Sequence, residues 1–227
     1  MCGRFAAGHL TWAQMMEIMG GFLHGPFRAD DAAPAPAQGY NIKPTQNVAV
    51  LTGKDELLLT TARWWFVPHW HRGVVSDWKQ TTFNARIETA DQKPTFRTAW
   101  ASHRCAIPAI GYFEWTGPKT ARQPWFITVE TNAPLFYFAG LASHLNDGTR
   151  TCTILTRPAL PQIAHLHHRI PVILAADQIE PWLSGDIGTM EAKDTLGTGW
   201  DGRFKFYPVA PMKRDSDGPE VIEPLQC

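Results

Sequence analysis

The fold is decided by three apolar runs, RCAIPAIGYFEW (Arg104 to Trp115), WFITVE (Trp125 to Glu130) and LFYFAGLA (Leu135 to Ala142). Aromatic and β-branched residues are frequent in them, and turn-forming residues separate each run from the next, as between successive strands. Asn146-Asp147-Gly148 is a turn signal that leads into a fourth strand candidate, Thr151 to Thr156. This part of the chain is therefore predicted to be β-structure.

Upstream of these runs, the sequence predicts a short helix and then a loop. Thr11 and Gln14 form a capping-box pattern, and apolar residues follow at helical spacing until Gly20-Gly21. The stretch from Gly25 to Gly39 contains three prolines and no periodicity, which indicates a loop.

The remaining elements set the fold class. Val48 to Leu51 and Leu57 to Phe66 flank Gly53-Lys54-Asp55, as the strands of a hairpin do. The other predictions are a helix at 94–102, a strand at 170–174, a helix at 176–183 and a last strand at 204–209. There is no internal repeat and no βαβ alternation. We therefore predict one domain over residues 1–227, of the α+β class, with a mostly antiparallel, barrel-like sheet and a few short flanking helices.

Charge and cysteine content limit the function. Lysine plus arginine and aspartate plus glutamate each number 21, so the net charge is zero and no global basic field attracts nucleic acid. Any DNA contact must come from a local cluster of arginines and rings. No apolar run is long enough to span a membrane, the N-terminus lacks an apolar signal core, and the four cysteines form no CxxC pair. We expect a reduced, intracellular, cytoplasmic protein without membrane association.

Cys2 matters through its position. Removal of Met1, the usual event before a small second residue, would leave Cys2 with a free α-amine beside its thiol. Such a 1,2-aminothiol condenses with an aldehyde to an imine, and the thiol then closes a thiazolidine ring, helped by proximity. The α-amine, with a pKa of about 8, is partly neutral at cellular pH. The alternative is an incidental second residue on a frayed terminus.

Asn84-Ala85-Arg86-Ile87-Glu88 places an amide, a guanidinium and a carboxylate close together. Arg86 is suited to forked contacts with a phosphate, and Asn84 can position a reacting oxygen or amine. Alternatively, Arg86 and Glu88 form a solvated ion pair.

Glu114 is the one carboxylate in the aromatic run GYFEW. Loss of solvation there would raise its pKa toward the range useful for proton transfer. Strand alternation, however, places Glu114 opposite both Phe113 and Trp115, where it can equally face water. The sequence alone is compatible with both interpretations.

Three histidines, His165, His167 and His168, lie within four positions. One of them can act as a general acid or base near neutral pH. A surface cluster is the plain alternative. A zinc site is the competing functional interpretation, although the spacing matches no zinc pattern closely. Its further ligands would come from Cys105, Cys152, His69 or His71.

Several aromatic side chains and one arginine could bind unpaired bases. Aromatic rings stack on any base, so such binding does not depend on the DNA sequence. The residues are Trp64, Trp65, Trp70, Trp115, Tyr40 and Arg4. Two or three of the tryptophans are expected to belong to the core instead.

In chain order these segments resemble the SOS-response-associated peptidase family, also called abasic-site processing proteins. Six motifs carry the resemblance: MCGRF at 1–5, YNIKP at 40–44, WWFVPHW at 64–70, NARIE at 84–88, GYFEW at 111–115 and HHRIP at 167–171. Any one motif is weak, but six in order, beginning with Cys2, are specific.

The resemblance implies a covalent thiazolidine between Cys2 and the opened sugar of an abasic site in single-stranded DNA. It also implies that Asn84, Glu114 and His167 are catalytic. The DNA-binding positions that it implies are Arg4, Pro44, Trp70, Arg86, Trp115, Thr156 and Arg169. Neither a metal nor an organic cofactor is expected, and no obligatory protein partner.

Two positions depart from the family pattern. His168 stands where an acidic residue is common, which would shift the proton affinity of His167. Trp65 stands where glycine is usual, which would narrow a DNA groove. Two other functions stay open: an N-terminal-nucleophile amide hydrolase, with the α-amine as base, and a non-catalytic module that binds single strands.

Overall fold

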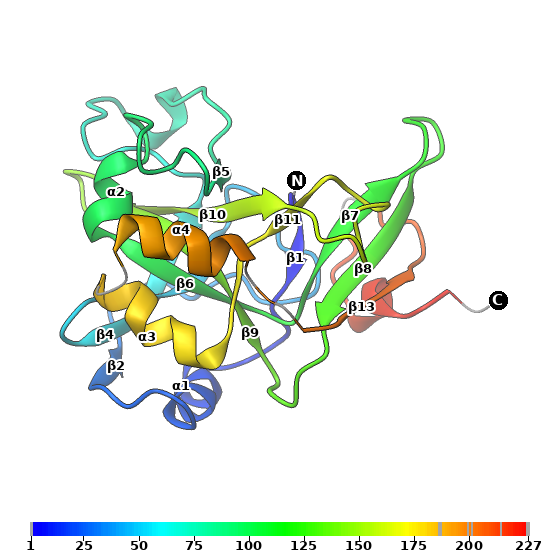
Figure 1. Ribbon diagram of the computed structural model, residues 1–227, viewed down its shortest axis with the longest axis horizontal. Helices are drawn as coiled ribbons and strands as arrows, with labels where there is room; N and C mark the ends of the chain where they lie inside the picture. The colour runs from blue at the N-terminus through cyan, green and yellow to red at the C-terminus, as the bar shows by residue number, and fades with distance from the viewer. Residues whose placement is uncertain (1, 186–187, 199, 201, 214, 226–227) are drawn as a thin grey trace.

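The apolar runs form two sheets that meet where β6 passes into β7 (Figure 1). The computed structural model describes residues 2–185, 188–198, 200, 202–213 and 215–225. Within them, one sheet has four strands in the order β1-β7-β8-β13, and the other has nine. Helices are short and few beside the strands, so the predicted α+β class is confirmed.

The larger sheet curls into a partial ring. Its main path runs β11-β10-β4-β3-β6-β9-β12, and β10 also pairs with β9, so the pairings return to β10. Most pairs are antiparallel; the exceptions are β10–β4, β10–β5 and β2–β4. The strands are β2 (Phe27–Ala29), β3 (Asn47–Thr52), β4 (Leu57–Trp64), β5 (Asn84–Arg86), β6 (Arg104–Ala109), β9 (Phe136–His144), β10 (Arg150–Pro158), β11 (Arg169–Pro171) and β12 (Ile173–Leu174).

Both faces of this sheet are buried, which explains the nearly continuous apolar runs. Val48 and Val50 of β3 belong to one core cluster, whereas Ala49 and Leu51 belong to another. Successive side chains of a strand point to opposite faces, so each strand serves two cores. The cluster that holds Val48 and Val50 also holds Cys2.

The run Arg104 to Trp115 is two strands rather than the single strand that was predicted. β6 ends at Ala109 and pairs with β9, whereas β7 (Gly111–Thr116) pairs with β8 (Gln123–Val129). Gly111 allows the change of sheet, because a Cβ there would lie 2.1 Å from the Phe126 ring. The smaller sheet is completed by β1 (Phe5–Ala6) and β13 (Phe204–Pro208).

The predicted helices are present. α1 (Trp12–Gly20) begins at Thr11, whose side chain accepts the Gln14 backbone N–H in the predicted capping box. α2 (Arg97–Ser102) is shorter than expected, and α3 (Ala176–Ser184) contains Pro181. The sequence interpretation missed α4 (Thr189–Thr198) and two 3-10 turns, Val75–Asp77 and Pro219–Ile222.

Two further predictions were wrong in detail. The predicted loop 25–39 contains β2, which pairs with β4 through backbone groups alone. The predicted strand 170–174 is divided at Val172, because β11 pairs with β10 and β12 pairs with β9. Among the described residues, no helix is long and apolar enough to cross a membrane.

Candidate functional site

The N-terminal segment reaches the site because β1 pairs with β7. Phe5 lies opposite Tyr112, and the carbonyl of Arg4 accepts the Phe113 N–H at 3.0 Å. Continued for two residues, this antiparallel register brings the start of the chain beside Glu114. Cys2 and Glu114 lie close enough that the carboxylate raises the pKa of the thiol.

Cys2 and Glu114 are both buried. Cys2 has no exposed surface, and its Sγ contacts the Arg4 carbonyl at 3.6 Å. Burial raises the pKa of the Cys2 thiol, and Glu114 raises it further. Glu114 is 4% exposed, and burial raises its pKa above the ordinary value, against an opposing effect of His168. The interpretation in which Glu114 faces water is therefore wrong: both faces of β7 are covered.

Tyr112 also belongs to this cluster of polar groups, although it was not identified from the sequence. It is fully buried, and burial, Cys2 and Glu114 all raise its pKa. Its Oη atom has no hydrogen-bond partner among the described residues. The signal was present, because Tyr112 and Glu114 are two residues apart on one strand and so share a face.

Asn84 lies on β5, which is held parallel to β10 with Asn84 opposite Ile154. Its amide nitrogen donates to the carbonyls of Phe83 at 3.1 Å and Ile154 at 3.5 Å. These two acceptors orient the amide. They leave Oδ1 buried and, among the described residues, without a hydrogen-bond partner.

Aromatic contacts connect the Asn84 strand with the Cys2 strand. The Trp64 ring packs edge-on against Phe5 at 5.1 Å and against Phe83 at 6.0 Å between centroids. The Trp64 indole also donates to the Phe83 carbonyl at 2.8 Å. Trp64 is fully buried, so it is one of the expected core tryptophans.

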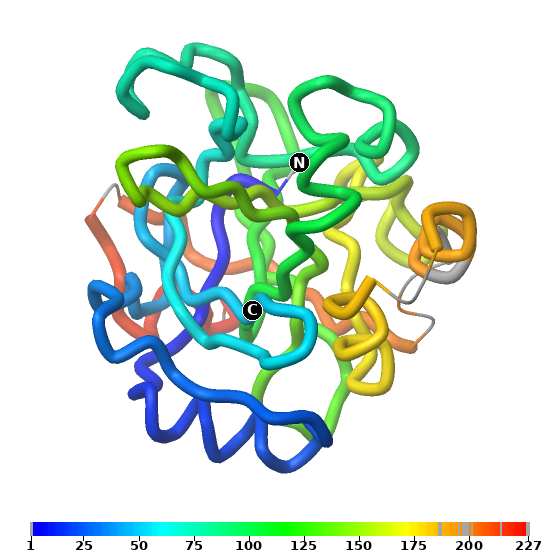
Figure 2. The backbone as a smooth tube through the Cα atoms, turned by 90° about the vertical axis from the view of Figure 1, so that its left-hand side faces the viewer, coloured from blue at the N-terminus to red at the C-terminus, as the bar shows by residue number. Residues whose placement is uncertain are grey.

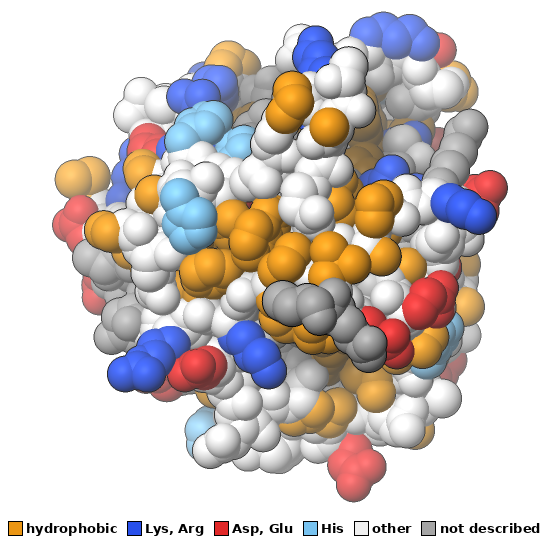
Figure 3. Space-filling view, turned by 90° about the vertical axis from the view of Figure 1, so that its right-hand side faces the viewer, with side chains coloured by type: hydrophobic (Ala, Val, Ile, Leu, Met, Phe, Trp, Pro, Cys, Tyr) orange, Lys and Arg blue, Asp and Glu red, His pale blue; other side chains and the backbone are white. Residues whose placement is uncertain are grey.

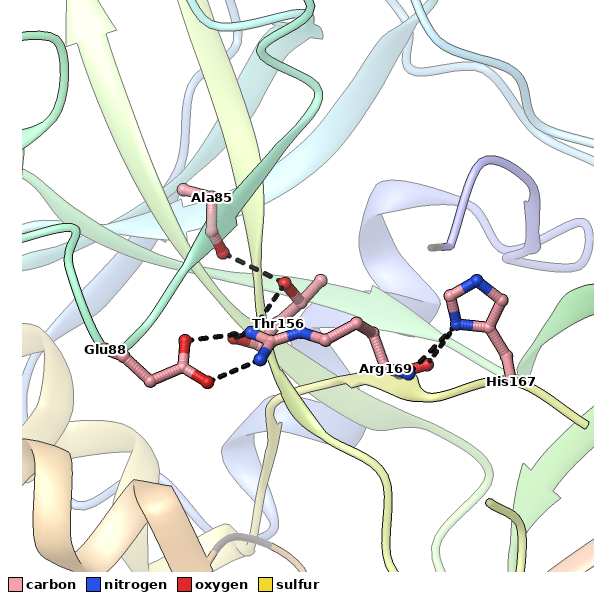
Figure 4. Close-up of polar contacts among 5 residues, drawn as sticks. All are labelled: Ala85, Glu88, Thr156, His167 and Arg169. Atoms are coloured by element: carbon pink, nitrogen blue, oxygen red, sulfur yellow. Dashed lines mark hydrogen bonds and ion pairs between the residues drawn. The ribbon is translucent and has the colours of Figure 1, made fainter. Parts of the chain in front are cut away.

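His167 is oriented by the backbone two residues later (Figure 4). Its Nδ1 lies 3.0 Å from the Arg169 backbone nitrogen and 3.1 Å from the Arg169 carbonyl oxygen, so it accepts from the first or donates to the second according to its tautomer. Burial lowers the pKa of His167, and the nearby positive charge of Arg169 also lowers it. The exposed His168 ring stacks on His167 at 4.3 Å, and the charge of His167 lowers the pKa of His168.

Arg169 is held inside the protein (Figure 4). Its side chain is 8% exposed, and Nη1 and Nη2 bind the two carboxylate oxygens of Glu88, the latter at 2.9 Å. Nη2 also donates to the Thr156 carbonyl at 2.6 Å, and Thr156 is fully buried. The ion pair predicted between Arg86 and Glu88 is thus replaced by one between Arg169 and Glu88, and Arg86 is exposed.

Arg4, near the start of the chain, lies at the edge of the site. Arg4 donates to Asn41 Oδ1 at 3.1 Å, and its guanidinium lies 5.6 Å from the centroid of the partly buried Trp115 ring. Pro44 is partly exposed, and Thr45 after it has a φ of 82°. A positive φ is strained for a β-branched residue, and such strain is often found at functional sites.

Trp70 is the exposed ring of the tryptophan-rich segment. It is 45% exposed and packs edge-on against Trp78 at 5.7 Å. Trp65, which departs from the family pattern, lies partly exposed against Phe83 and donates to the Gln80 carbonyl at 3.1 Å. Trp70 therefore offers a free face at the surface, and Trp65 partly does.

The described residues contain no group of three or more histidine, cysteine or acidic side chains placed to hold a metal ion. Cys105 and Cys152 are buried free thiols, as is Cys2. His165 packs on Phe206 at 5.4 Å rather than joining the His167–His168 pair. The site thus brings together the Cys2 thiol, the Glu114 carboxyl, the Tyr112 hydroxyl and a histidine pair.

Residues 1–212 match the family model described as SOS response associated peptidase (SRAP). The chain is 35% identical to the abasic site processing protein YobE of Bacillus subtilis, over 98% of this chain and 99% of that one. It is 28% identical to the abasic site processing protein YedK of Escherichia coli, over 99% and 100%. A crystal structure of a Bacteroides thetaiotaomicron protein shares the fold, with a TM-score of 0.80 at 21% identity, over 99% and 100% of the two chains.

Proposed function

The chain belongs to the SOS response associated peptidase family, and from this we propose that it processes abasic sites in single-stranded DNA through a covalent bond to Cys2. The names of its curated relatives support the substrate. The observation that carries the proposal is the position of Cys2 beside a buried carboxyl whose pKa is raised.

The reaction needs the α-amine of Cys2, which becomes free once Met1 is removed. The neutral amine attacks C1′ of the open-chain sugar, and the resulting carbinolamine loses water to give an imine. The thiol sulfur then adds to the imine carbon while its proton passes to the nitrogen. One aldehyde and one aminothiol thus give a thiazolidine and one water, with no cofactor.

Glu114 fits the proton transfers of both steps. Burial raises its pKa, so at a given pH more of it is protonated than of an ordinary carboxyl, and the protonated form can donate a proton to the departing hydroxyl of the carbinolamine. As a carboxylate it can then accept the proton of the thiol. The thiol needs such a base, because burial and Glu114 raise its own pKa and keep it protonated.

The other polar groups hold the reactants. The unpaired Oδ1 of Asn84 can accept a hydrogen bond from the amine or from a sugar hydroxyl. His167, whose Nδ1 is oriented by the backbone of Arg169, can exchange a proton with the ring-opened sugar. Arg169 and Thr156, which the family resemblance assigns to DNA, are buried, and Arg169 binds both Glu88 and Thr156. We propose that they act chiefly by holding His167, whereas Arg4 and Arg86 meet phosphates.

Base stacking rather than charge would supply most of the non-covalent affinity. Figure 3 shows hydrophobic side chains gathered across the face at the end of the smaller sheet, with lysines and arginines around its margins. The chain has no net charge, so long-range attraction to DNA is weak. A covalent bond makes high non-covalent affinity unnecessary.

The test is denaturing electrophoresis after mixing the protein with abasic single-stranded DNA. Protein that begins at Cys2 is expected to give a heat-stable adduct, whereas protein that keeps an N-terminal tag is expected to give none, because its α-amine is blocked. Adduct formation by the tagged protein would exclude the α-amine mechanism. Cleavage of an amide substrate without DNA would instead favour the hydrolase.

The exposed ring predicts a preference for single strands. Trp70→Ala should slow crosslinking to abasic single strands by about fivefold to a hundredfold at limiting protein, since one base stack contributes roughly 1–3 kcal/mol. Val74→Ala, at a neighbouring position that is 61% exposed, is the matched control and should change nothing. Wild type should react more slowly with an abasic site inside a duplex, where unstacking costs a few kcal/mol. Equal rates on both forms of DNA would show that Trp70 does not stack.

A further inference from the structure

A cavity of about 440 Å³ lies at an end of the strand ring. Six segments line it: β2, the β3–β4 turn, the junction of α2 with β6, the end of β9, the start of β10 and the end of α3. Figure 2 faces this end of the molecule. None of the residues that we place in the Cys2 site lines the cavity.

Cations dominate its wall, although the whole chain is neutral. The cationic side chains are Arg28, Lys54, Arg104 and Arg150, and Glu56 is the one carboxylate among the lining residues. Arg28 pairs with Glu56 at 3.0 Å, and Arg150 pairs with Asp30, outside the lining, at 3.1 Å. Near the cavity, cationic side chains therefore outnumber carboxylates, even when the members of the two ion pairs are counted.

Arg104 gives the cavity a guanidinium in a fixed orientation. It is 5% exposed, its Nε donates to the Trp100 carbonyl at 2.9 Å, and it lies 4.6 Å from the centroid of the Trp182 ring. A guanidinium held in this way loses little side-chain entropy when it binds a ligand. Its charge is also screened less than that of a surface lysine.

Two histidines and several hydroxyls complete the wall. His144 accepts the Arg150 Nε–H at its Nε2, 3.3 Å away, and the His103 ring lies 5.9 Å from it. Burial lowers the pKa of both rings. The Thr52 and Ser102 hydroxyls already donate to the carbonyls of Arg104 and Thr98, at 3.2 Å and 3.0 Å, and Leu58 and Leu183 add apolar surface.

We propose that this cavity binds a phosphate group carried by a ligand of nucleotide size. Guanidinium and ammonium groups that line one cavity match phosphate oxygens, and arginine binds them in forked geometry. The volume exceeds what a bare ion needs and falls within the range of small-molecule sites, and the apolar surface suits a ring or sugar. A free nucleotide and an intact DNA strand both offer this phosphate.

Calorimetric titration of the full-length protein with inorganic phosphate and with a deoxynucleoside monophosphate tests the proposal. Both should bind, the nucleotide more tightly. Lys54→Glu should weaken both by about tenfold or more, because it removes a charged hydrogen-bond donor and adds repulsion. Lys119→Glu, equally exposed but in the β7–β8 loop, is the matched control and should leave binding unchanged. Thermal unfolding of both variants should match wild type.

Two further measurements distinguish a free nucleotide from a DNA strand as the source of the phosphate. If an intact oligonucleotide displaces the nucleotide, and Lys54→Glu also weakens DNA binding, the ligand is the DNA backbone. If the oligonucleotide does not compete, and crosslinking of Lys54→Glu to abasic DNA is unchanged, the ligand is a free nucleotide. Absence of nucleotide binding by wild type, or equal weakening by Lys54→Glu and Lys119→Glu, would overturn the proposal. Neither result bears on the reaction at Cys2.

Discussion

Cys2→Ala is expected to abolish the heat-stable adduct with abasic DNA while it keeps the ability to form an imine. The variant retains an α-amine after Met1 is removed, but it has no sulfur to close the ring. An imine at C1′ makes the neighbouring sugar proton acidic, which opens a path to β-elimination. Borohydride should therefore trap the variant on abasic DNA, and the DNA should be cut slowly.

Cys105→Ala is the matched control for this experiment. Cys105 is also a fully buried free thiol, but it lies within β6, where its nitrogen belongs to a peptide bond and cannot serve as an α-amine. Its removal should leave the adduct intact. A heat-stable adduct formed by Cys2→Ala without borohydride would place the covalent bond elsewhere, and the proposed chemistry would be wrong.

The second large effect is expected for Glu114→Gln, which keeps the shape of the side chain and removes its titratable proton. Crosslinking should slow by roughly 10²-fold or more, because both proton transfers lose their carrier. The rate of wild type should fall at high pH as Glu114 ionises, and this limb of the pH profile should be absent from the variant. Crosslinking rates measured across a pH series test this role of Glu114, with Glu130→Gln, at an exposed position, as the control.

The same substitution should not destabilise the protein. Burial raises the folded-state pKa of Glu114, so the folded state binds this proton more tightly than the unfolded chain does. As pH rises from the unfolded to the folded pKa, wild type loses stability, and above both values it carries the cost of a buried carboxylate. Glu114→Gln lacks that cost, so its thermal midpoint near neutral pH should equal or exceed that of wild type. A lower midpoint together with slow crosslinking would indicate a structural role for Glu114.

Local signals in the sequence predicted the local elements well. The capping box at Thr11, the hairpin around Gly53 and the turn at Asn146-Asp147-Gly148 were all recovered, because each depends on neighbours within a few residues. The change of sheet at Ile110 could not be seen, since the apolar run continues through it. β2 was missed because it is only three residues long and pairs through its backbone. Three side chains are too few to show the alternation that marks a strand.

The candidate site was less predictable than the fold. Alternation along β7 showed that Glu114 and Phe113 point to opposite faces of the sheet. It did not show that β1 and its neighbours cover the face to which Glu114 points. That depends on pairing between distant segments. The partner of Glu88 could not be predicted either, because Arg169 reaches it only through the pairing of β11 with β10. The proposed catalytic set came from the resemblance to a family, and the structure showed that Cys2 and Glu114 are buried whereas Asn84 and His167 are half-buried.

The pairing of the first strand with β7 also governs when reactivity can arise. Cys2 is made well before Glu114 and His167, and the site needs contacts between segments far apart in the chain. Such long-range pairings form late in folding. Under the proposed mechanism, a growing chain therefore carries an aminothiol that still lacks its proton donor and its histidine. The mechanism thus implies that an unfinished polypeptide is poorly equipped to attach itself to the aldehydes of the cell.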